Sequence, residues 1–439
     1  MEITLGDGPI DVEVRDGVLR ARGLPYGRAV RFEAGRPVDP WSAPRDATRP
    51  GPACPQRIGR LDFVTGPVLR DLRVDEDCLV LSVTAPQDAD RLPVMVWFHG
   101  GAYVAGGGES AKYDPTRLAH DGRVVVVTVT YRLGIFGYLA PNEAEADDNI
   151  GLRDQLLALQ WVQRNVRAFG GDPDDVTVFG QSAGGDSVLA LMVCDGAEGL
   201  FHRAIAQSAP LGVGTGTAEV ARGRADMAAA MQAAMSASLG GASPRDVGAG
   251  RLLEAEAAAV VAAQRFSTLG GMAFAPRMGR RPLPRADELA ARFAEAAQRV
   301  ELLIGYTRDD GAPFVALQPR VARLRSDFVR RQAIRVARRP VTARIFGRGA
   351  EAFAADWRAN GGRVGTYRVD WAPGDTPLGA CHCIELPHLF GTPQTWADAP
   401  MLGRARGPDE ALGERMRSAW AAFAHGGVAA LPAGELRFG

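Results

Sequence analysis

Two unbroken apolar runs lie in the first third of the chain, at residues 93–98 and 123–129. Strands without polar alternation are buried on both faces, as in a mostly parallel sheet that is covered by helices on either side. A helical pattern follows at residues 152–169, where apolar residues recur at helical spacing before a glycine pair ends the helix. The order of these segments predicts an α/β protein.

The remainder of the chain continues this alternation, with one exception. Further strand-like runs occur at residues 10–14, 79–83, 301–304 and 364–370. Residues 217–298 differ, because they are rich in Ala, Glu and Arg and carry few strand signals. Alternating strands and helices predict a three-layer sheet, and a helical insertion between two halves of that sheet fits the middle segment best. We expect one domain over residues 1–439, with a helical cap at about 212–300.

The composition of the chain argues against some classes of binding partner. The chain has 439 residues, of which 46% are hydrophobic, enough for a large core. Its 51 basic and 51 acidic residues balance, and no long basic patch indicates a nucleic-acid partner. The N-terminus lacks the features of a secretory signal, and no apolar run is long enough to span a membrane. We expect a cytoplasmic protein that binds neither nucleic acid nor a membrane.

The five cysteines are an odd number and do not have the spacing of a disulfide framework. The sequence Cys381-His382-Cys383 looks like part of a metal cluster. A Cys-x-Cys pair with no second pair nearby is nevertheless a weak zinc signal. We therefore expect no metal site.

The pentapeptide Gly-Gln-Ser-Ala-Gly at residues 180–184 is the first candidate for chemistry. It follows an apolar, β-branched run at 176–179 and precedes a helical pattern at 185–192. A nucleophile elbow requires this strand, sharp turn and helix, with glycines on both sides of the serine, because side chains there would collide with neighbouring backbone. The motif alone also fits an ordinary glycine and serine turn, so other residues must decide.

Acyl transfer also needs a base that takes the serine proton and an acid that orients the base. α/β-Hydrolases supply them in the chain order Ser, Asp or Glu, His. Asp310 lies just after a predicted strand, and the histidines beyond it are His382, His388 and His425. We expect His382 to be the base, because it lies in a loop after a strand, whereas His388 falls in a predicted helix and His425 follows the C-terminal helix. Asp309 precedes Asp310, so a shift of one residue stays open.

The sequence His-Gly-Gly-Ala-Tyr at residues 99–103 directly follows the apolar run at 93–98. Glycines in such a turn leave backbone N–H groups free to point at an oxygen, because no side chain fills the space in front of them. The lysine and serine of a phosphate-binding loop are absent. An ordinary flexible loop is the alternative, since a second glycine run follows at 106–108, but the position after the strand favours an oxyanion hole.

Several sequence blocks match a known family in their order, from about residue 10 to residue 425. They lie at residues 54–56, 76–79, 131–134, 149–156, 169–173, 200–208 and 379–386. Through these blocks the chain resembles the type-B carboxylesterases, the cholinesterase-like family of the α/β-hydrolase fold. The resemblance implies a mostly parallel central sheet flanked by helices. It also implies hydrolysis of a small-molecule carboxylic ester through an acyl-serine intermediate, with neither a metal nor an organic cofactor.

The resemblance further implies roles for individual residues. Ser182 would be the nucleophile, His382 the general base and then acid, and Asp310 the acid that orients the histidine. The oxyanion hole would be formed by the backbone N–H groups of Gly101, Ala102 and Ala183. By resemblance alone, Tyr103 and Phe314 line the acyl and alcohol pockets; the alternative for each is simple packing in the core.

The chain departs from the family pattern in several places. Asp310 stands where most members have glutamate, although Gly311 after it matches the family. Gln181 replaces the usual glutamate before the serine, which removes a charge and disfavours a choline ester. The interval from Asp310 to His382 is 72 residues, which is short for the family. We therefore expect a shortened cap segment at about 315–350 and a site that is open or is completed by the second subunit of a homodimer.

Cys54 and Cys78 match a pair that secreted relatives oxidise, and without a visible secretory signal we expect free thiols here. The leading functional hypothesis is a serine esterase. The same triad also suits an acyltransferase, a lactonase or a cyclase of specialised metabolism, because admission or exclusion of water decides between hydrolysis and transfer. A non-catalytic binding member is the third hypothesis, and the presence of the complete set of candidate residues disfavours it.

Overall fold

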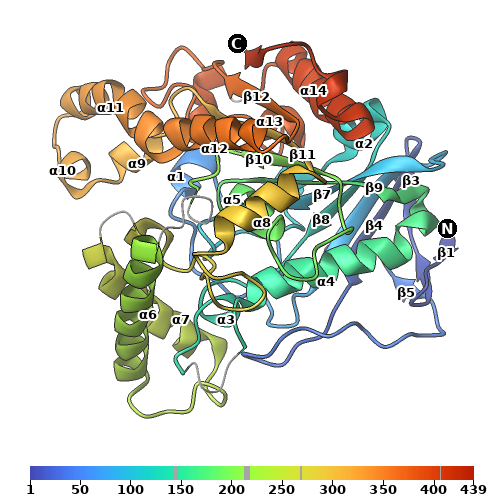
Figure 1. The fold of residues 1–439 in the computed structure, drawn as a ribbon, viewed down its shortest axis with the longest axis horizontal. Helices are drawn as coiled ribbons and strands as arrows, with labels where there is room; N and C mark the ends of the chain where they lie inside the picture. Colours follow the sequence, from blue (N-terminus) through green and yellow to red (C-terminus); the bar gives the residue numbers. More distant parts are fainter. Residues whose placement is uncertain (143–146, 212–217, 267–268, 406) are drawn as a thin grey trace.

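The fold is a central sheet with helices on both faces (Figure 1). The computed structural model describes residues 1–142, 147–211, 218–266, 269–405 and 407–439. The strands are β1 (Glu2–Thr4), β2 (Pro9–Asp11), β3 (Glu13–Arg15), β4 (Val18–Pro25), β5 (Arg45–Asp46), β6 (Val80–Pro86), β7 (Leu92–Phe98), β8 (Val125–Val129), β9 (Gly171–Gln181), β10 (Arg203–Gln207), β11 (Glu301–Thr307), β12 (Val364–Val369) and β13 (Glu435–Phe438).

The helices lie between and after these strands. They are α1 (Asp62–Thr65), α2 (Thr116–Gly122), α3 (Gly134–Gly137), α4 (Ile150–Asn165), α5 (Ala183–Leu191), α6 (Ala218–Leu239), α7 (Ala249–Ala263), α8 (Leu289–Ala297), α9 (Ala312–Ala316), α10 (Pro319–Ala322), α11 (Asp327–Thr342), α12 (Arg348–Ala359), α13 (Leu386–Leu389) and α14 (Glu410–Gly426). A π-helical turn, η6 (Ala343–Gly347), joins α11 to α12.

The main sheet has ten strands in the order β13-β12-β11-β10-β9-β7-β8-β6-β4-β3. Neighbouring strands from β13 to β8 are parallel, and β6, β4 and β3 continue one edge in antiparallel pairing. A separate three-stranded sheet, β1-β2-β5, lies near the N-terminus. The predicted mostly parallel sheet is confirmed.

Each central strand contributes to two hydrophobic cores. In β7, Val94, Val96 and Phe98 pack in one core, whereas Met95 and Trp97 pack in the other. Successive side chains of a strand point to opposite faces, so a strand covered on both sides reads as an unbroken apolar run. Helices α4, α5, α8 and α12 contribute to the first core, and α2, α13 and α14 contribute to the second. This arrangement explains the apolar runs seen in the sequence.

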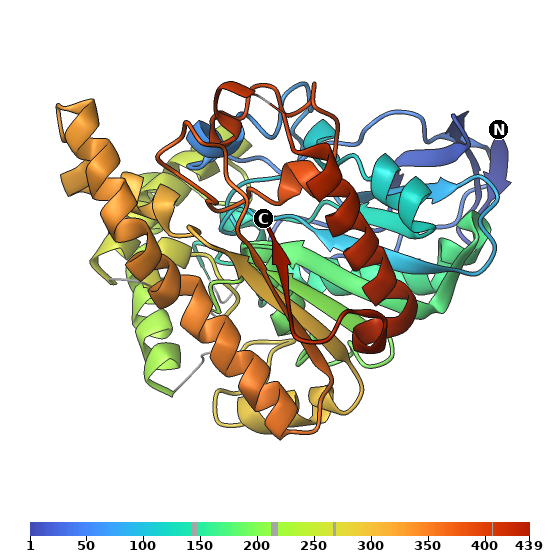
Figure 2. The same cartoon turned by 90° about the horizontal axis from the view of Figure 1, so that it is seen from above.

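Helices α6, α7 and α8 lie between β10 and β11, which are neighbours in the sheet. Helices α6 and α7 pack together at one side of the body (Figure 1, lower left). Residues 212–217, the first part of the expected cap, lie outside the described residues. In the second expected cap segment, at about 315–350, α10 and the outer half of α11 project from the body (Figures 1 and 2).

Other sequence expectations meet the structure with small differences. The predicted helix at 152–169 divides into α4 and a 3₁₀ turn, Val166–Phe169. The prediction that His425 follows the C-terminal helix is wrong, because α14 continues to Gly426 and ends only where Gly427 takes a positive φ. Cys54 and Cys78 are buried free thiols. Among the described residues, no helix is both long and apolar enough to cross a bilayer.

A buried carboxyl group joins α7 to the body. Glu256 is buried, and its Oε2 accepts a hydrogen bond of 2.9 Å from the backbone N–H of Ile135. Burial raises the pKa of Glu256 from 4.5 to about 7. Between these values the folded protein holds a proton that the unfolded chain has released, so this group makes stability fall as pH rises.

We predict that Glu256→Gln removes this pH-dependent loss of stability, because a neutral amide of the same shape replaces the carboxyl group. The free energy of unfolding of the wild type should fall by about 3 kcal/mol more than that of the variant between about pH 4.5 and pH 7. Urea unfolding at both pH values measures the difference. Glu254→Gln is the matched control, because Glu254 is exposed on the same helix. Equal pH slopes for wild type and Glu256→Gln would contradict the assignment.

Candidate active site

The candidate residues meet at the carboxyl edge of the parallel strands. Ser182 follows β9, Gly101 follows β7, Asp310 follows β11, and His382 lies between β12 and α13. The carboxyl ends of parallel strands lie at one edge of a sheet, so residues far apart in the sequence converge there. The sheet order β11-β10-β9-β7 brings three of the four connections together.

The turn at Ser182 is sharp and strained. Ser182 has φ 58° and ψ −122°, and its N–H donates to the carbonyl of Gln207 at 2.8 Å. A positive φ is unfavourable for a residue with a side chain, so the surroundings must hold it. A Cβ on Gly180 would lie 2.5 Å from the carbonyl carbon of Gly184, and one on Gly184 would overlap the carbonyl oxygen of Phe98. Glycine is therefore required on both sides, and the serine side chain is held partly exposed.

The loop after β7 presents free backbone donors. Gly101 and Ala102 have positive φ values of 123° and 56°. Within the described residues, the N–H groups of Gly101, Ala102 and Ala183 donate to no other protein atom. Unpaired N–H groups at such a loop and at a helix N-terminus form a site for a negatively charged oxygen.

His99, the first residue of this loop, is held in place by Tyr131. Its ring is fully buried and stacks on the ring of Tyr131, with 4.5 Å between centroids. The hydroxyl of Tyr131 donates to the carbonyl of His99 at 2.6 Å. Burial lowers the pKa of His99 to about 4, so this imidazole is neutral near pH 7. The contacts between His99 and Tyr131 hold the backbone at the start of the loop after β7.

His382 and Asp310 are in direct contact. The Nδ1–H of His382 donates to Oδ1 of Asp310 at 2.5 Å, and both side chains are fully buried. The second oxygen of Asp310 accepts from the hydroxyl of Ser208 at 2.7 Å and from the N–H of Thr307 at 3.0 Å. These bonds orient the carboxylate and leave Nε2 of the imidazole to act as an acceptor.

Two aromatic rings enclose the imidazole of His382. The ring of Phe314 lies 5.2 Å from it in an edge-on arrangement, and the ring of Phe346 lies 5.1 Å away. Phe314 is partly exposed, whereas Phe346 is buried. Tyr103, the other aromatic residue singled out in the sequence, is buried, and its hydroxyl donates to Asp186 at 3.0 Å.

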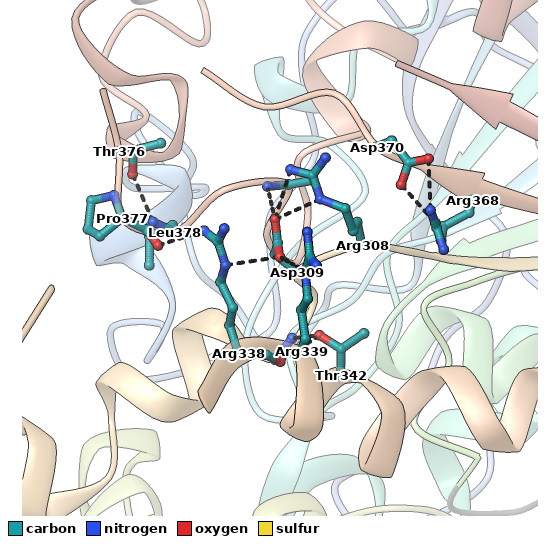
Figure 3. A network of polar contacts seen from close by, with 12 residues as sticks. Arg308, Asp309, Arg338, Arg339, Thr342, Arg368, Asp370, Thr376, Pro377 and Leu378 are labelled. Atoms are coloured by element: carbon teal, nitrogen blue, oxygen red, sulfur yellow. Dashed lines mark hydrogen bonds and ion pairs between the residues drawn. The ribbon is translucent and has the colours of Figure 1, made fainter. Parts of the chain in front are cut away.

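Asp309 has different partners, shown in Figure 3. Its carboxylate is fully buried and forms ion pairs with Arg308 and Arg338 at 3.0 Å and with Arg339 at 3.8 Å. It also accepts from the backbone N–H of Ala380, in the loop that carries His382, at 3.0 Å. Asp309 therefore ties the acidic turn to α11 and to the histidine loop, while Asp310 alone contacts the imidazole.

Gln181 occupies the other side of the histidine. Its amide nitrogen lies 3.2 Å from Nε2 of His382 and donates to it in this tautomer. The thiol of Cys383 lies 3.6 Å from the amide oxygen of Gln181. Among the described residues, no hydrogen bond joins Ser182 Oγ to His382, so the structure brings the serine and histidine to the same edge without a hydrogen bond between them.

Sequence reasoning did not identify several residues at this site. Ser208 lies in one of the recognised blocks, which was the available signal, but its contact with Asp310 depends on the pairing of β10 with β11. Phe346 and Arg338 carried no signal. Glu385 follows His382 by three residues, and burial together with the charge of Asp310 raises its pKa to about 8. This second carboxyl group is therefore protonated near pH 7.

The described residues show no convergence of three His, Cys, Asp or Glu side chains of the kind that holds a metal ion. Cys381 and Cys383 flank His382, and burial raises the pKa of both thiols well above the usual value. Thiols of that kind are poor metal ligands, because the thiolate is the binding form. The site instead offers a strained hydroxyl, an oriented imidazole and unpaired N–H donors.

Comparisons with known proteins agree on one family. The sequence model of the Carboxylesterase family matches residues 11–343. A probable N-octanoylanthranilate hydrolase of Rhodococcus erythropolis is 39% identical over 94% of this chain and 90% of its own length. The para-nitrobenzyl esterase of Bacillus subtilis is 36% identical over 97% of this chain and 90% of its own. Among solved structures, a thermophilic PNB esterase has a TM-score of 0.80 and 34% identity, covering 97% of this chain and 91% of its own.

The glycine requirement at the turn is testable. We predict that Gly184→Ala lowers the free energy of unfolding by about 1–3 kcal/mol, because the added methyl group overlaps the carbonyl oxygen of Phe98. Gly250→Ala is the control, since a Cβ there has no heavy atom within 4 Å and the residue lies in α7. It should be neutral or slightly stabilising. Equal stabilities of the two variants in urea unfolding would show that the turn tolerates a side chain.

Proposed function

We propose that Ser182, His382 and Asp310 form the catalytic triad of this chain, which belongs to the carboxylesterase family and is a serine carboxylic-ester hydrolase. The observation that carries this proposal is the 2.5 Å hydrogen bond between His382 and Asp310 at the sheet edge where the strained Ser182 turn lies. The carboxylate of Asp309 forms ion pairs with arginines, and this supports Asp310 as the acid that orients His382.

In the first half of the reaction, Ser182 Oγ attacks the carbonyl carbon of the ester and Nε2 of His382 takes the hydroxyl proton. Asp310 stabilises the imidazolium that forms. The N–H groups of Gly101, Ala102 and Ala183 receive the negative charge that develops on the carbonyl oxygen. The bond to the alcohol then breaks, His382 returns its proton to the leaving oxygen, and an acyl-serine remains.

In the second half, water enters the place of the alcohol. His382 takes a proton from this water as its oxygen attacks the acyl carbon, and the same N–H groups receive the oxyanion again. Collapse of this intermediate breaks the bond to Ser182, whose oxygen regains the proton from His382. The products are the carboxylic acid and the free enzyme.

Gln181 takes part in the resting state of this site. Its amide donates to the Nε2 lone pair of His382 that must accept the serine proton. Binding of an ester therefore has to exchange the Gln181 contact for one with Ser182. Catalytic hydrogen bonds often tighten only in the substrate complex.

The site favours an uncharged substrate. The rings of Phe314 and Phe346 surround His382, and Gln181 next to Ser182 carries no charge. The relatives named above act, by their names, on a para-nitrobenzyl compound and on N-octanoylanthranilate. We propose a small to medium ester with an apolar or aromatic part as the substrate class.

Steady-state hydrolysis of a series of p-nitrophenyl acyl esters tests the triad. We predict that Ser182→Ala lowers kcat by about 10⁴-fold or more, and that Asp310→Asn lowers it by about 10³- to 10⁴-fold, because the imidazole loses its orienting partner. Absence of turnover in the wild type would refute esterase function itself.

Asp309→Asn is the matched control for the choice of acid. The change removes a buried carboxylate charge from the partly buried Arg308 and Arg338, so we expect about 3 kcal/mol of lost stability. We expect at most about a tenfold loss of kcat with KM unchanged, since Asp309 contacts only the supporting loop. Full activity of Asp310→Asn together with an inactive but folded Asp309→Asn would show that the acid is misassigned.

Gln181→Glu tests the charge preference. We predict that this change raises kcat/KM about tenfold for a choline ester relative to its uncharged carbon analogue, 3,3-dimethylbutyl acetate, because it restores a negative charge beside the serine. Gln160→Glu makes the same change at an exposed position of α4 and should leave the ratio unchanged. A ratio that is the same in all three proteins would remove Gln181 from substrate selection.

A further inference from the structure

A segment next to the active site projects into solvent. Residues 317–339, here called the basic arm, comprise Leu317, α10 and most of α11. None of residues 317–333 is buried, and the first buried side chain is that of Ile334. Figures 1 and 2 show α10 and the outer half of α11 extending beyond the rest of the molecule. A helix that extends this far is not needed to cover the sheet.

The basic arm concentrates positive charge in a chain that is neutral overall. Its charged residues are Arg320, Arg323, Arg325, Asp327, Arg330, Arg331, Arg335, Arg338 and Arg339. Three of these arginines have acidic partners: Arg338 and Arg339 pair with Asp309, and Arg330 pairs with Asp327. In the part of the chain that the structure describes, the other five form no ion pair. The field of the arm is therefore strongly positive.

Apolar side chains are exposed among these charges. Leu317 is 40% exposed, Phe328 70%, Val329 47% and Val336 76%. Val336 follows Phe328 and Val329 by eight and seven residues, so the three lie along one side of α11. Arg331 and Arg335 lie next to this stripe at helical spacing. A side chain as large as Phe328, so far exposed on a projecting helix, indicates contact with something outside this chain.

We propose that the basic arm docks on an anionic lipid surface. Arginine side chains extend along apolar surface to reach phosphate groups, while Phe and Val enter the boundary between headgroups and acyl chains. Each arginine near an anionic bilayer adds to the attraction. A nucleic acid would pair with the arginines but would leave the valines exposed. The absence of a membrane-spanning apolar run, on which the expectation of no membrane partner rests, does not exclude docking at the surface of a bilayer.

The arm is continuous with the candidate active site. Helix α9 precedes Leu317 and carries Phe314, whose ring lies 5.2 Å from that of His382. The guanidinium of Arg60 lies over the ring of Phe314, 5.9 Å from its centroid, and the exposed Ile58 and Phe63 flank Arg60 in the sequence. A docked arm therefore holds the rim of the site close to the lipid surface. This consequence rests on the proposed function, whereas docking itself does not.

Vesicle co-sedimentation of the full chain tests the proposal. We expect binding to vesicles of phosphatidylcholine mixed with phosphatidylglycerol, weaker binding at high salt, and little binding to phosphatidylcholine alone. Arg331→Gln/Arg335→Gln should lower the partition coefficient about tenfold or more, and Phe328→Ser about tenfold. Arg15→Gln/Arg49→Gln is the control, because it removes the same charge from exposed sites elsewhere. It should bind as the wild type does.

Three results would overturn the proposal. The first is no binding of the wild type to anionic vesicles, and the second is an equal loss in the control, which would indicate net charge rather than the arm. The third is a dimer in sedimentation velocity that Phe328→Ser dissociates, which would make this face a subunit interface. Thermal unfolding shows that each variant is folded. Hydrolysis of soluble p-nitrophenyl acetate should be unchanged in all variants, and its absence in the wild type would refute the proposed function without affecting the binding result.

Discussion

The close approach of three backbone segments at Gly180, Gly184 and Phe98 is the constraint on which the site depends. Strand β9 must turn into α5 within one residue while β7 passes alongside, and no side chain fits between them. That contact holds Ser182 at a positive φ at the N-terminus of α5. The strain is local, but the whole sheet supports it, since both strands are buried on two faces.

The two neighbouring aspartates have different partners because their surroundings differ, although their side chains are identical. Asp310 accepts from His382, Ser208 and Thr307, so its carboxylate is fixed in one orientation against the imidazole. Asp309, one residue earlier, points to arginines of α11 and to the histidine loop. The segment after α9 thus contributes an anchor for the turn at Asp309 as well as the projecting arm. Its arginines serve both purposes from opposite ends of one helix.

The sequence allowed much of this to be predicted, for identifiable reasons. Apolar runs revealed the sheet because burial on two faces leaves a local pattern, whereas Ser182, Asp310 and His382 were proposed from their positions after strands and from resemblance to a family. Family membership is confirmed. The contact of Gln181 with His382 left no such pattern, because it joins residues 201 positions apart through tertiary packing. Charge summed over the chain likewise conceals where the arginines gather.

The most direct test of the account is where a covalent probe attaches. After reaction with a fluorophosphonate, peptide mapping by mass spectrometry should find one label per chain, on Ser182, and His382→Ala should slow its formation by orders of magnitude while the protein stays folded. Labelling at another residue, or an unchanged rate in His382→Ala, would contradict the claim that the strained serine and the Asp310-oriented imidazole act as one unit.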